Sequence, residues 1–456
     1  MEISPSVLGV NPKKWNIPVL EKYCERLHID IVPEGLTPGF VRRIKTQLVK
    51  DIHLMVDNVE KGIERYSFAG IINFHIEAGN TLNLIMKARS LGVKVGLSVN
   101  PETRVKALVP FLGIIDEVLL MSVHPGRSGR KFINIAKKIR QIRKLNKAVI
   151  IKVDGGLNNK TVKKIRRADI AVMGAYIFRS RNIEEVLRRL SLMHVAKELR
   201  KSVIRMVSSA KSGHPAGSLG MADVFAVLFF DAMKYDPANP EWKKRDYLVL
   251  SNGHICPVLY ACMARAGFFP KAELLTLRKL GSRLQGHPHR SSLPGLESTS
   301  GPLGIGLSQA AGMALALKMD KKDNRVFCIT SDGEHDEGNT WEAVMFAPKY
   351  SLNNLVCIID KNNIQLSGNT NEIMPLGNLK KKYKAFGWKV KVVDGHDMKK
   401  IKRALAIKSK KPLAIIANTI PGRGVSFMEN KWEWHGKAPN DEESVNALNK
   451  LGRSAE

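Results

Sequence analysis

The sequence contains no uninterrupted apolar run of 18 residues, so we expect no helix that spans a membrane. Cysteine is also scarce, because there are five in the chain and none of them forms a CxxC pair. This distribution argues against a disulfide framework and predicts reduced thiols in the cytoplasm. The first residues, MEISPSV, have neither the basic nor the apolar region of a secretory signal peptide, which agrees with that location.

Acidic residues are few relative to basic ones. The chain has 42 Asp and Glu against 73 Lys and Arg, which gives a net charge of +31. The excess is spread over both halves of the chain and is not gathered in a tail. A charge of this size could attract nucleic acid, but no helix-turn-helix, zinc finger or aromatic RNA-binding platform accompanies it. We therefore favour a solvated basic surface over nucleic-acid binding, and phosphorylated small substrates would also favour such a positive field.

Short apolar segments recur through residues 1–190, and basic or amphipathic helical segments separate most of them. The 456-residue chain is 44% hydrophobic, which is enough for two or three domains with real cores. We expect strands at 2–8, 27–32, 51–56, 72–77, 94–99, 117–123, 149–154 and 169–174. Eight strands that alternate with helices predict a (β/α)8 TIM barrel as the first domain.

Four polar side chains interrupt these apolar strands. His28 and Asp30 lie two residues apart, so they point to the same face of one strand. His53 follows in the next strand, and Asp154 ends the seventh. A single His in a strand is usually a core residue, but four polar residues at matching strand ends predict a divalent metal site at the barrel mouth. Mixed nitrogen and oxygen ligands fit Zn2+, Fe2+, Mn2+ or Co2+ without choosing among them.

This half resembles ribulose-phosphate 3-epimerase in five motifs: SPS at 4–6, HID at 28–30, DIHLM at 51–55, MSVHPG at 121–126 and VDGG at 153–156. The resemblance implies that the four polar residues bind the metal and that Asp30 and Asp154 are the two proton-transfer groups. The C3 proton of a ketose lies next to the carbonyl, so one carboxylate can remove it while the other returns a proton to the opposite face. The resemblance also implies substrate contacts at Ser6, His53, Met55, Gly126, Gly129, Gly155, Gly156, Gly174 and Ala175.

Three loops depart from the epimerase pattern. Ser128-Gly129 stands where a double Gly is usual, and Gly174-Ala175 stands where Gly-Ser is usual. Main-chain N–H donors survive both changes, so we expect phosphate binding to persist. Val32-Pro33-Glu34-Gly35 replaces Met-Asp-Gly, which leaves the sugar preference open. We interpret His75 and His124 as structural.

The second half, residues 194–456, also alternates strands and helices. We expect strands at 247–251, 326–330, 355–360, 389–394 and 413–419, which predict an α/β sandwich. A barrel helix at 182–192 and a helix at 195–208 follow one another with no flexible linker between them. We therefore place the domains at 1–190 and 194–456.

Asp332 follows one apolar strand of this half, and Asn362 follows the next. Parallel strands joined by a crossover helix would bring both residues to neighbouring strand ends. A carboxylate, an amide oxygen and a main-chain carbonyl suit Mg2+ that also binds a diphosphate. Several histidines lie in Gly-rich loops, where they could exchange protons near neutral pH.

These stretches resemble the N-terminal, thiamine diphosphate-binding domain of transketolase. The resemblance implies Mg2+ ligands at Asp332, Asn362 and the Ile364 carbonyl. It implies cofactor contacts at His254, Gly301, Leu303 and Gly333. It also implies that His214, His287 and His435 face the sugar and handle its hydroxyl protons.

A partner is also implied, because the Glu that activates thiamine in transketolases belongs to a following domain that this chain lacks. We expect a separate transketolase C-terminal subunit, in a homodimer or an α2β2 heterotetramer.

The full interpretation is a bifunctional pentose-phosphate protein that epimerises ribulose 5-phosphate to xylulose 5-phosphate and transfers a two-carbon ketol unit. One alternative is a hexulose-phosphate epimerase fused to a different ketol transferase. The other is a basic nucleic-acid-binding or scaffold protein with inactive sites.

Overall fold

The computed structural model describes residues 2–3, 17–24, 26–124, 132–158, 160–165, 167–180 and 182–452. Its contacts divide the chain into two units, with the division between Ser191 and Leu192. That division falls inside α7 (Ile183–Ala210), which is one helix where we expected two. Residues 183–210 contain no Gly or Pro, the residues that most often end a helix. The helix expected at 182–192 therefore continues into the one expected at 195–208.

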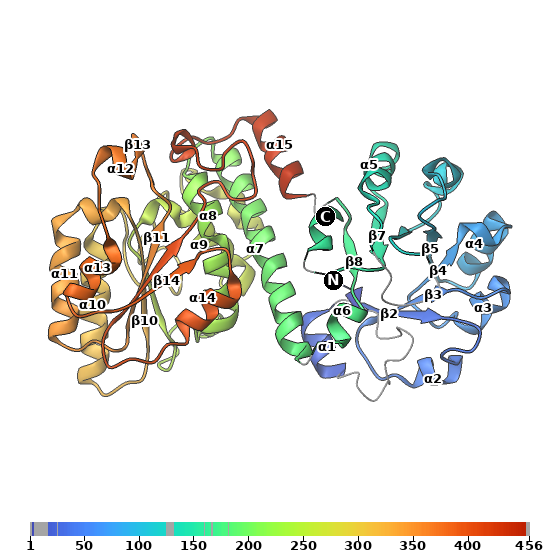
Figure 1. Cartoon of the computed structure of the whole chain (residues 1–456), viewed down its shortest axis with the longest axis horizontal. Helices are drawn as coiled ribbons and strands as arrows, with labels where there is room; N and C mark the ends of the chain where they lie inside the picture. Colours follow the sequence, from blue (N-terminus) through green and yellow to red (C-terminus); the bar gives the residue numbers. More distant parts are fainter. Residues whose placement is uncertain are drawn as a thin grey trace. The chain divides into compact units, whose positions relative to one another are not determined.

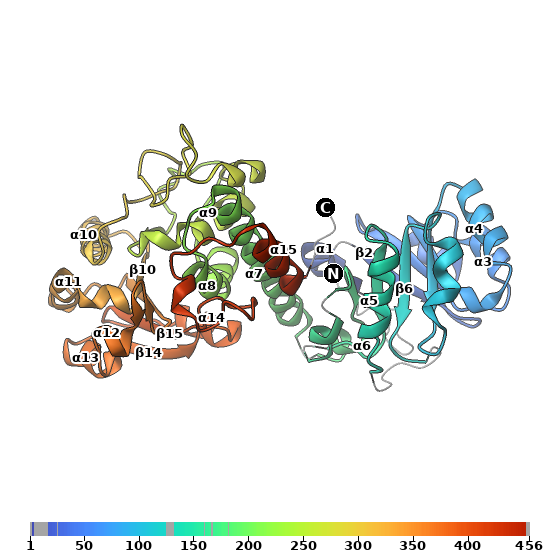
Figure 2. The same ribbon diagram turned by 90° about the horizontal axis from the view of Figure 1, so that it is seen from above.

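The first unit is a closed barrel of eight parallel strands in sequence order, which confirms the predicted fold (Figures 1 and 2). The strands are β1 (Glu2–Ile3), β2 (Arg26–Ile31), β3 (Val49–Leu54), β4 (Ile71–His75), β5 (Lys94–Val99), β6 (Glu117–Met121), β7 (Ile150–Asp154) and β8 (Ile170–Val172). Between them lie α1 (Ile17–Tyr23), α2 (Pro38–Arg43), α3 (Val59–Arg65), α4 (Thr81–Ser90), the 3-10 helix η3 (Val105–Phe111), α5 (Ala136–Leu145) and η4 (Thr161–Ile165), and α6 (Ala175–Phe178) follows β8.

Strand β2 shows how the barrel sorts its side chains. Leu27, Ile29 and Ile31 are buried and alternate with polar residues, so they share the face that packs on the surrounding helices. The residues between them, His28 and Asp30, point into the barrel. The same alternation continues in β3 and β7, and it brings polar side chains from three strands to one mouth.

The second unit is a five-stranded parallel sheet in the order β14-β15-β11-β10-β9, with helices on both faces (Figure 1). The strands are β9 (Tyr247–Leu250), β10 (Val326–Ser331), β11 (Leu355–Lys361), β14 (Lys389–Asp394) and β15 (Leu413–Asn418). Its α-helices after α7 and its hairpin are α8 (Pro215–Val227), α9 (Cys256–Ala266), α10 (Ile305–Met319), α11 (Gly338–Lys349), the hairpin of β12 (Ile364–Gln365) and β13 (Gly368–Asn369), α12 (Thr370–Ile373), α13 (Leu379–Ala385), α14 (Met398–Leu405) and α15 (Asp441–Leu451). All five predicted strands and the α/β sandwich are confirmed.

Two apolar cores hold this sheet between its helices. Phe327 and Ile329 of β10 belong to the core shared with α7, α8, α9 and α14. Val326 and Cys328 belong to the core shared with α10, α11 and α13. Because both faces of β10 are covered, its sequence is a continuous apolar run.

One helical stretch among the described residues, Pro215–Ala232, is long and apolar enough to cross a membrane. It contains Asp223 and Asp231, which explains why no uninterrupted apolar run was visible in the sequence. Within the structure 83% of this stretch is buried, as in the core helix of a globular domain, so it is weak evidence for a membrane span.

Candidate active sites

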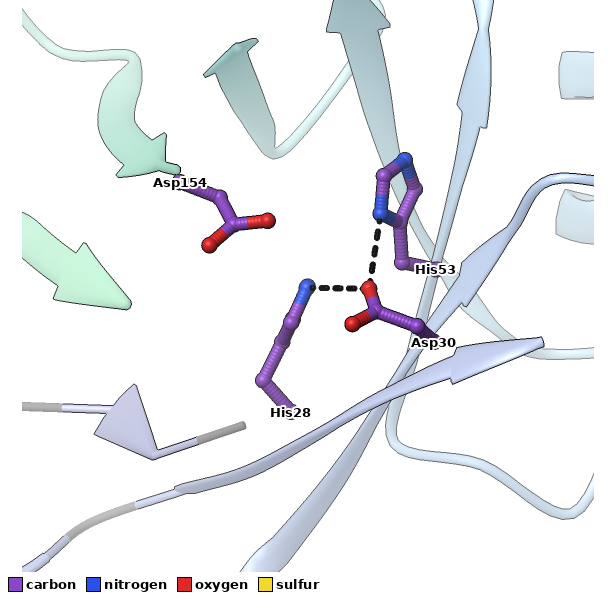
Figure 3. A group of neighbouring side chains, drawn as sticks. All are labelled: His28, Asp30, His53 and Asp154. Atoms are coloured by element: carbon purple, nitrogen blue, oxygen red, sulfur yellow. Dashed lines mark hydrogen bonds and ion pairs between the residues drawn. The ribbon is translucent and has the colours of Figure 1, made fainter. Parts of the chain in front are cut away.

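Four polar side chains converge at the mouth of the barrel: His28, Asp30, His53 and Asp154 (Figure 3). One possible ligand atom from each lies within 4.8 Å of all the others. The Oδ1 atom of Asp30 is 3.1 Å from His53 Nδ1 and 3.5 Å from His28 Nε2, while Asp154 approaches from β7. Two imidazoles and two carboxylates at this spacing fit a first-row divalent metal ion.

The two carboxyl groups of this cluster differ in proton affinity. Burial, and then the negative charge of Asp30, raise the pKa of Asp154 to about 7. Burial acts in the same direction at Asp30, but hydrogen bonds from His28 and His53 outweigh it and hold the pKa of Asp30 well below its usual range. Two carboxyl groups whose pKa values lie far apart can serve as a base and an acid at the same pH.

His75 extends the cluster away from the metal ligands. Its Nε2 atom lies 3.1 Å from His53 Nε2, and its Nδ1 atom lies 3.3 Å from Glu77 Oε2. The interpretation of His75 as structural therefore needs refinement, since it contacts a candidate ligand directly. His75 lies two residues beyond Asn73 in β4, so the alternation of the strand places both on the inward face. That alternation is visible in the sequence and could have placed His75 near the cluster.

The glycines after β7 lie beside the cluster and have backbone conformations that favour glycine. Gly155 has φ of 107° and Gly156 has φ of 60°. A Cβ atom at Gly155 would be 2.4 Å from Val123 Cγ2, so a larger residue does not fit there. Gly174 directly precedes Ala175, the first residue of α6. Met55, another predicted substrate contact, lies just after β3, and its main-chain N–H donates to the carbonyl oxygen of Ile31. Three predicted substrate contacts, Ser6, Gly126 and Gly129, lie outside the described residues.

In the second unit, the ends of β10 and β11 bring Asp332 and Asn362 together. The two strands run in register with Ser331 opposite Asp360, and Asp332 N–H donates to Asp360 O at 3.0 Å. The Asn362 Oδ1 atom accepts from Ile364 N–H at 3.0 Å, which folds the loop back on itself. Burial raises the pKa of Asp332 to about 6, as expected of a carboxyl group placed to receive a cation. These carboxylate and amide oxygens fit Mg2+.

Four histidines form a second cluster in this unit: His214, His254, His287 and His435. The ring centroids are 4.9 Å apart for His254 and His435, 5.2 Å for His214 and His254, 5.6 Å for His214 and His435, and 6.4 Å for His214 and His287. Burial lowers the pKa of each ring, to about 4 for His214. The cluster is therefore a group of neutral imidazoles at pH 7, which can both accept and donate protons.

The glycine loops border this histidine cluster. A Cβ atom on Gly253 would be 3.1 Å from His287 Cδ2 and 3.2 Å from Gly301 N, so the predicted cofactor contact at Gly301 lies close to the imidazoles. Leu303 is 37% exposed, as a residue open to a ligand or partner would be. A Cβ atom on Gly333 would be 3.0 Å from Gln365 Cγ, in the loop that follows β11.

Arg278 was missed by the sequence analysis. Its guanidinium donates to Ser212 Oγ at 2.8 Å and lies 3.5 Å from His214 Nδ1. It comes from a loop more than sixty residues along the chain, and no motif in the sequence linked it to the histidines.

Comparison with known proteins matches both units to enzyme families. Residues 192–456 match the family model of the transketolase thiamine diphosphate binding domain, and residues 2–178 match that of the ribulose-phosphate 3 epimerase family. A 6-deoxy-6-sulfo-D-fructose transketolase subunit of Clostridium sp. (strain MSTE9) is 43% identical over 251 residues, which cover 54% of this chain and 91% of that protein. An apulose-4-phosphate transketolase subunit of Phocaeicola vulgatus is 40% identical over 260 residues, which cover 56% of this chain and 92% of that protein.

Full-length transketolases share only part of their length with this chain. Human transketolase is 42% identical over 248 residues, which cover 54% of this chain and 40% of the human protein. The crystal structure of transketolase from Campylobacter jejuni matches with a TM-score of 0.55 and 35% identity, over 58% of this chain and 43% of that one. The chain therefore belongs to the transketolase family through its thiamine diphosphate binding domain, which is fused behind a domain of the ribulose-phosphate 3-epimerase family.

Proposed function

We propose that the barrel epimerises a ketose phosphate at C3, with ribulose 5-phosphate as the first candidate, and yields xylulose 5-phosphate. The observation that carries this proposal is the convergence of His28, Asp30, His53 and Asp154, with two carboxyl groups of different pKa. The family match of residues 2–178 supports the same chemistry.

The proton transfers of this reaction fall to the two carboxyl groups. Asp30 is held as a carboxylate, so it is the group that takes the C3 proton from one face of the sugar. Asp154, whose pKa is about 7, returns a proton to the opposite face, and the roles reverse for the back reaction. His28 and His53 would hold a divalent metal together with these carboxylates. When bound, that metal would supply positive charge opposite the negative charge that develops on the C2 oxygen.

For the second unit we propose a role in transferring a two-carbon ketol unit between sugar phosphates. Asp332, Asn362 and the Ile364 carbonyl would hold Mg2+, and the glycine loops would receive the diphosphate. Thiamine diphosphate, when bound, supplies an electron sink for the cleavage of a carbon–carbon bond. The neutral histidines His214, His287 and His435 would exchange protons with the sugar hydroxyls, and His254 would contact the cofactor.

A partner subunit is part of this proposal. The sulfofructose and apulose-4-phosphate relatives are each named as a transketolase subunit, and 91% and 92% of their lengths align with this chain. We infer that a separate C-terminal transketolase subunit completes the thiamine site, in an α2β2 assembly or around a homodimer of this chain. The product of the barrel would then be a substrate of the thiamine site. We place the protein and both reactions in the cytoplasm.

A second set of substrates has support of its own. The relatives carry the names of a sulfonated fructose and of apulose 4-phosphate, so the ketol transferase could act on a different sugar. The Val32–Gly35 segment begins directly after β2, the strand that carries Asp30. Its departure from the epimerase pattern would alter the sugar preference. A hexulose phosphate is the corresponding candidate for the barrel.

One assay separates these possibilities. The full chain, freed of metal and then loaded with Co2+, Mn2+, Zn2+ or Fe2+, should epimerise ribulose 5-phosphate, with turnover that depends on the metal. Turnover of hexulose phosphates alone would favour the second set of substrates. If neither ribulose 5-phosphate nor any hexulose phosphate exchanges its C3 proton with any of the four metal ions bound, the epimerase assignment is wrong.

A further inference from the structure

Below the metal-ligand cluster, the barrel interior holds a chain of buried charges. Asp51, Glu117 and Lys152 come from β3, β6 and β7, and each side chain is fully buried. Arg26 donates to Glu117 Oε2 at 2.7 Å, and the Lys152 ammonium bridges Glu117 and Asp51. Of the four described side chains that these contacts join, two are basic and two are acidic.

This chain of charges ends at a candidate metal ligand. Asp51 Oδ1 lies 3.2 Å from Nδ1 of His28, whose ring is also fully buried. The same oxygen accepts from Asn73 Nδ2 at 2.7 Å, and Lys152 binds the other oxygen. Three neighbours among the described residues thus hold Asp51, and its contact with His28 leaves the opposite ring nitrogen, Nε2, directed toward Asp30 and the cluster.

Buried charges carry a large desolvation penalty, and apolar side chains of similar volume usually stabilise a core at least as well. The network is therefore poorly explained by stability alone. The 3.2 Å separation of His28 Nδ1 and Asp51 Oδ1 resembles a recurring contact of metal sites, in which the histidine nitrogen that faces away from the metal donates to a carboxylate. That contact fixes both the tautomer and the orientation of the ring.

We propose that Asp51 is a positioning residue that holds His28 with its Nε2 lone pair toward the metal, and that Lys152 and Asn73 hold Asp51 in place. This inference rests on the proposed function, because it presupposes that His28 ligates a metal. Asp51 would act through His28, because it contacts the ring nitrogen opposite the one directed toward the cluster.

Replacing Asp51 by Asn tests this role. The amide oxygen would turn to Lys152, since an ammonium requires an acceptor, and the NH2 group would face His28. Nδ1 of His28 would then have to accept a hydrogen bond from that NH2 group, so the imidazole proton would move to Nε2. There it would compete with the metal for the nitrogen. The Co2+ affinity of the full chain, read from its visible absorption with Mg2+ in excess to occupy the oxygen site of the second unit, should fall by about 10- to 100-fold.

Glu117→Gln is the matched control, because Glu117 also binds Lys152 in the same buried layer but does not touch His28. Its Co2+ affinity should stay within about threefold of the wild type, and its visible spectrum should be unchanged. A merely structural role for the network predicts equal effects of both variants, or no change in affinity for either, and both results would overturn the proposal.

Asn73→Ala keeps every charge and removes one of the contacts that hold Asp51. It should lower the Co2+ affinity by a smaller factor than Asp51→Asn, and it decides the question if Asp51→Asn fails to fold. Unchanged Co2+ affinity in folded Asn73→Ala would then count against the proposal. A wild-type chain that binds no Co2+ at the barrel would instead refute the proposed epimerase function, so the two failures can be told apart.

Discussion

The Asp332 carboxylate accepts a hydrogen bond of 2.6 Å from the main-chain N–H of Asn363, which lies two residues beyond the end of the neighbouring strand β11. This contact ties the loops after β10 and β11 to each other, so the carboxylate of one loop lies beside the amide oxygen of the other. Asn363 has φ of 60°, in the left-handed region, which Asn tolerates better than most residues. This hydrogen bond and the left-handed conformation of Asn363 together set the backbone that presents the candidate Mg2+ ligands.

The candidate metal sites of the barrel and of the second unit should bind metal independently, so a titration can measure each of them. Mn2+ titration of the full chain, followed by the electron paramagnetic resonance signal of the free ion, should give two sites per chain. Asp332→Ala should remove only the site of the second unit, with an affinity loss of more than about 100-fold, because a direct ligand matters more than its outer contacts. Asp154→Ala should remove only the barrel site. If either variant removes both sites, or neither, the assignment of ligands is wrong.

Acid should destabilise the second unit partly through His335. This ring is fully buried, with Nδ1 donating to Ser331 O at 2.7 Å and Nε2 accepting from Tyr383 OH at 2.8 Å, and burial lowers the pKa of His335 to about 4. Between pH 4 and 6.5 the unfolded chain binds a proton there that the folded chain does not. The stabilisation is therefore complete above pH 6.5 and is lost as pH falls toward 4, by about 3 kcal/mol in total.

Urea unfolding followed by tryptophan fluorescence can measure this loss, since five of the six tryptophans lie in residues 192–456. The free energy of unfolding should fall less between pH 7 and pH 5 in His335→Gln than in the wild type. The four clustered histidines remain in both proteins, so their share of the pH dependence cancels in the comparison. An equal slope in the two proteins would show that His335 does not carry the effect.

Much of the fold, and the convergence of the four candidate ligands in the barrel, could be predicted because the signals are local. The alternation in β2 and the apolar run of β10 identified strands, and strand ends located His28, Asp30 and Asp332. The sheet order could not be predicted, because β15 pairs between β14 and β11 through long-range packing that leaves no local pattern. The contacts of Asp51 with Lys152 and of Arg278 with His214 join residues far apart in sequence, and single-chain patterns do not pair them.

Gly155 should tolerate no side chain. Its φ of 107° is strained for any other residue, and an added Cβ would overlap Val123. We expect Gly155→Ala to lower the free energy of unfolding of the barrel by about 3 kcal/mol, from backbone strain and overpacking together. Gly92→Ala is the matched control, since its φ is 74° but no described atom lies within 4 Å of the added Cβ, and it should lose only about 1 kcal/mol. Urea unfolding followed by far-UV circular dichroism would contradict this account if both variants lost the same amount.

The two carboxyl groups of the barrel should have separable roles when ribulose 5-phosphate is incubated in D2O. Asp30→Asn removes the group that takes the C3 proton, so both deuterium incorporation at C3 and epimerisation should fall by about 10²- to 10⁴-fold. Asp154→Asn, assayed with Co2+ in excess so that the remaining ligands and the amide oxygen can hold the metal, leaves that base in place but removes the group that serves the opposite face. It should still incorporate deuterium into ribulose 5-phosphate while forming little xylulose 5-phosphate.

Proton NMR of the C3 position measures both rates in one sample. Glu102→Gln serves as the control, because Glu102 is an exposed carboxylate outside the cluster. Deuterium incorporation that survives in Asp30→Asn but not in Asp154→Asn would exchange the two roles, and equal rates in all variants would remove both residues from the chemistry.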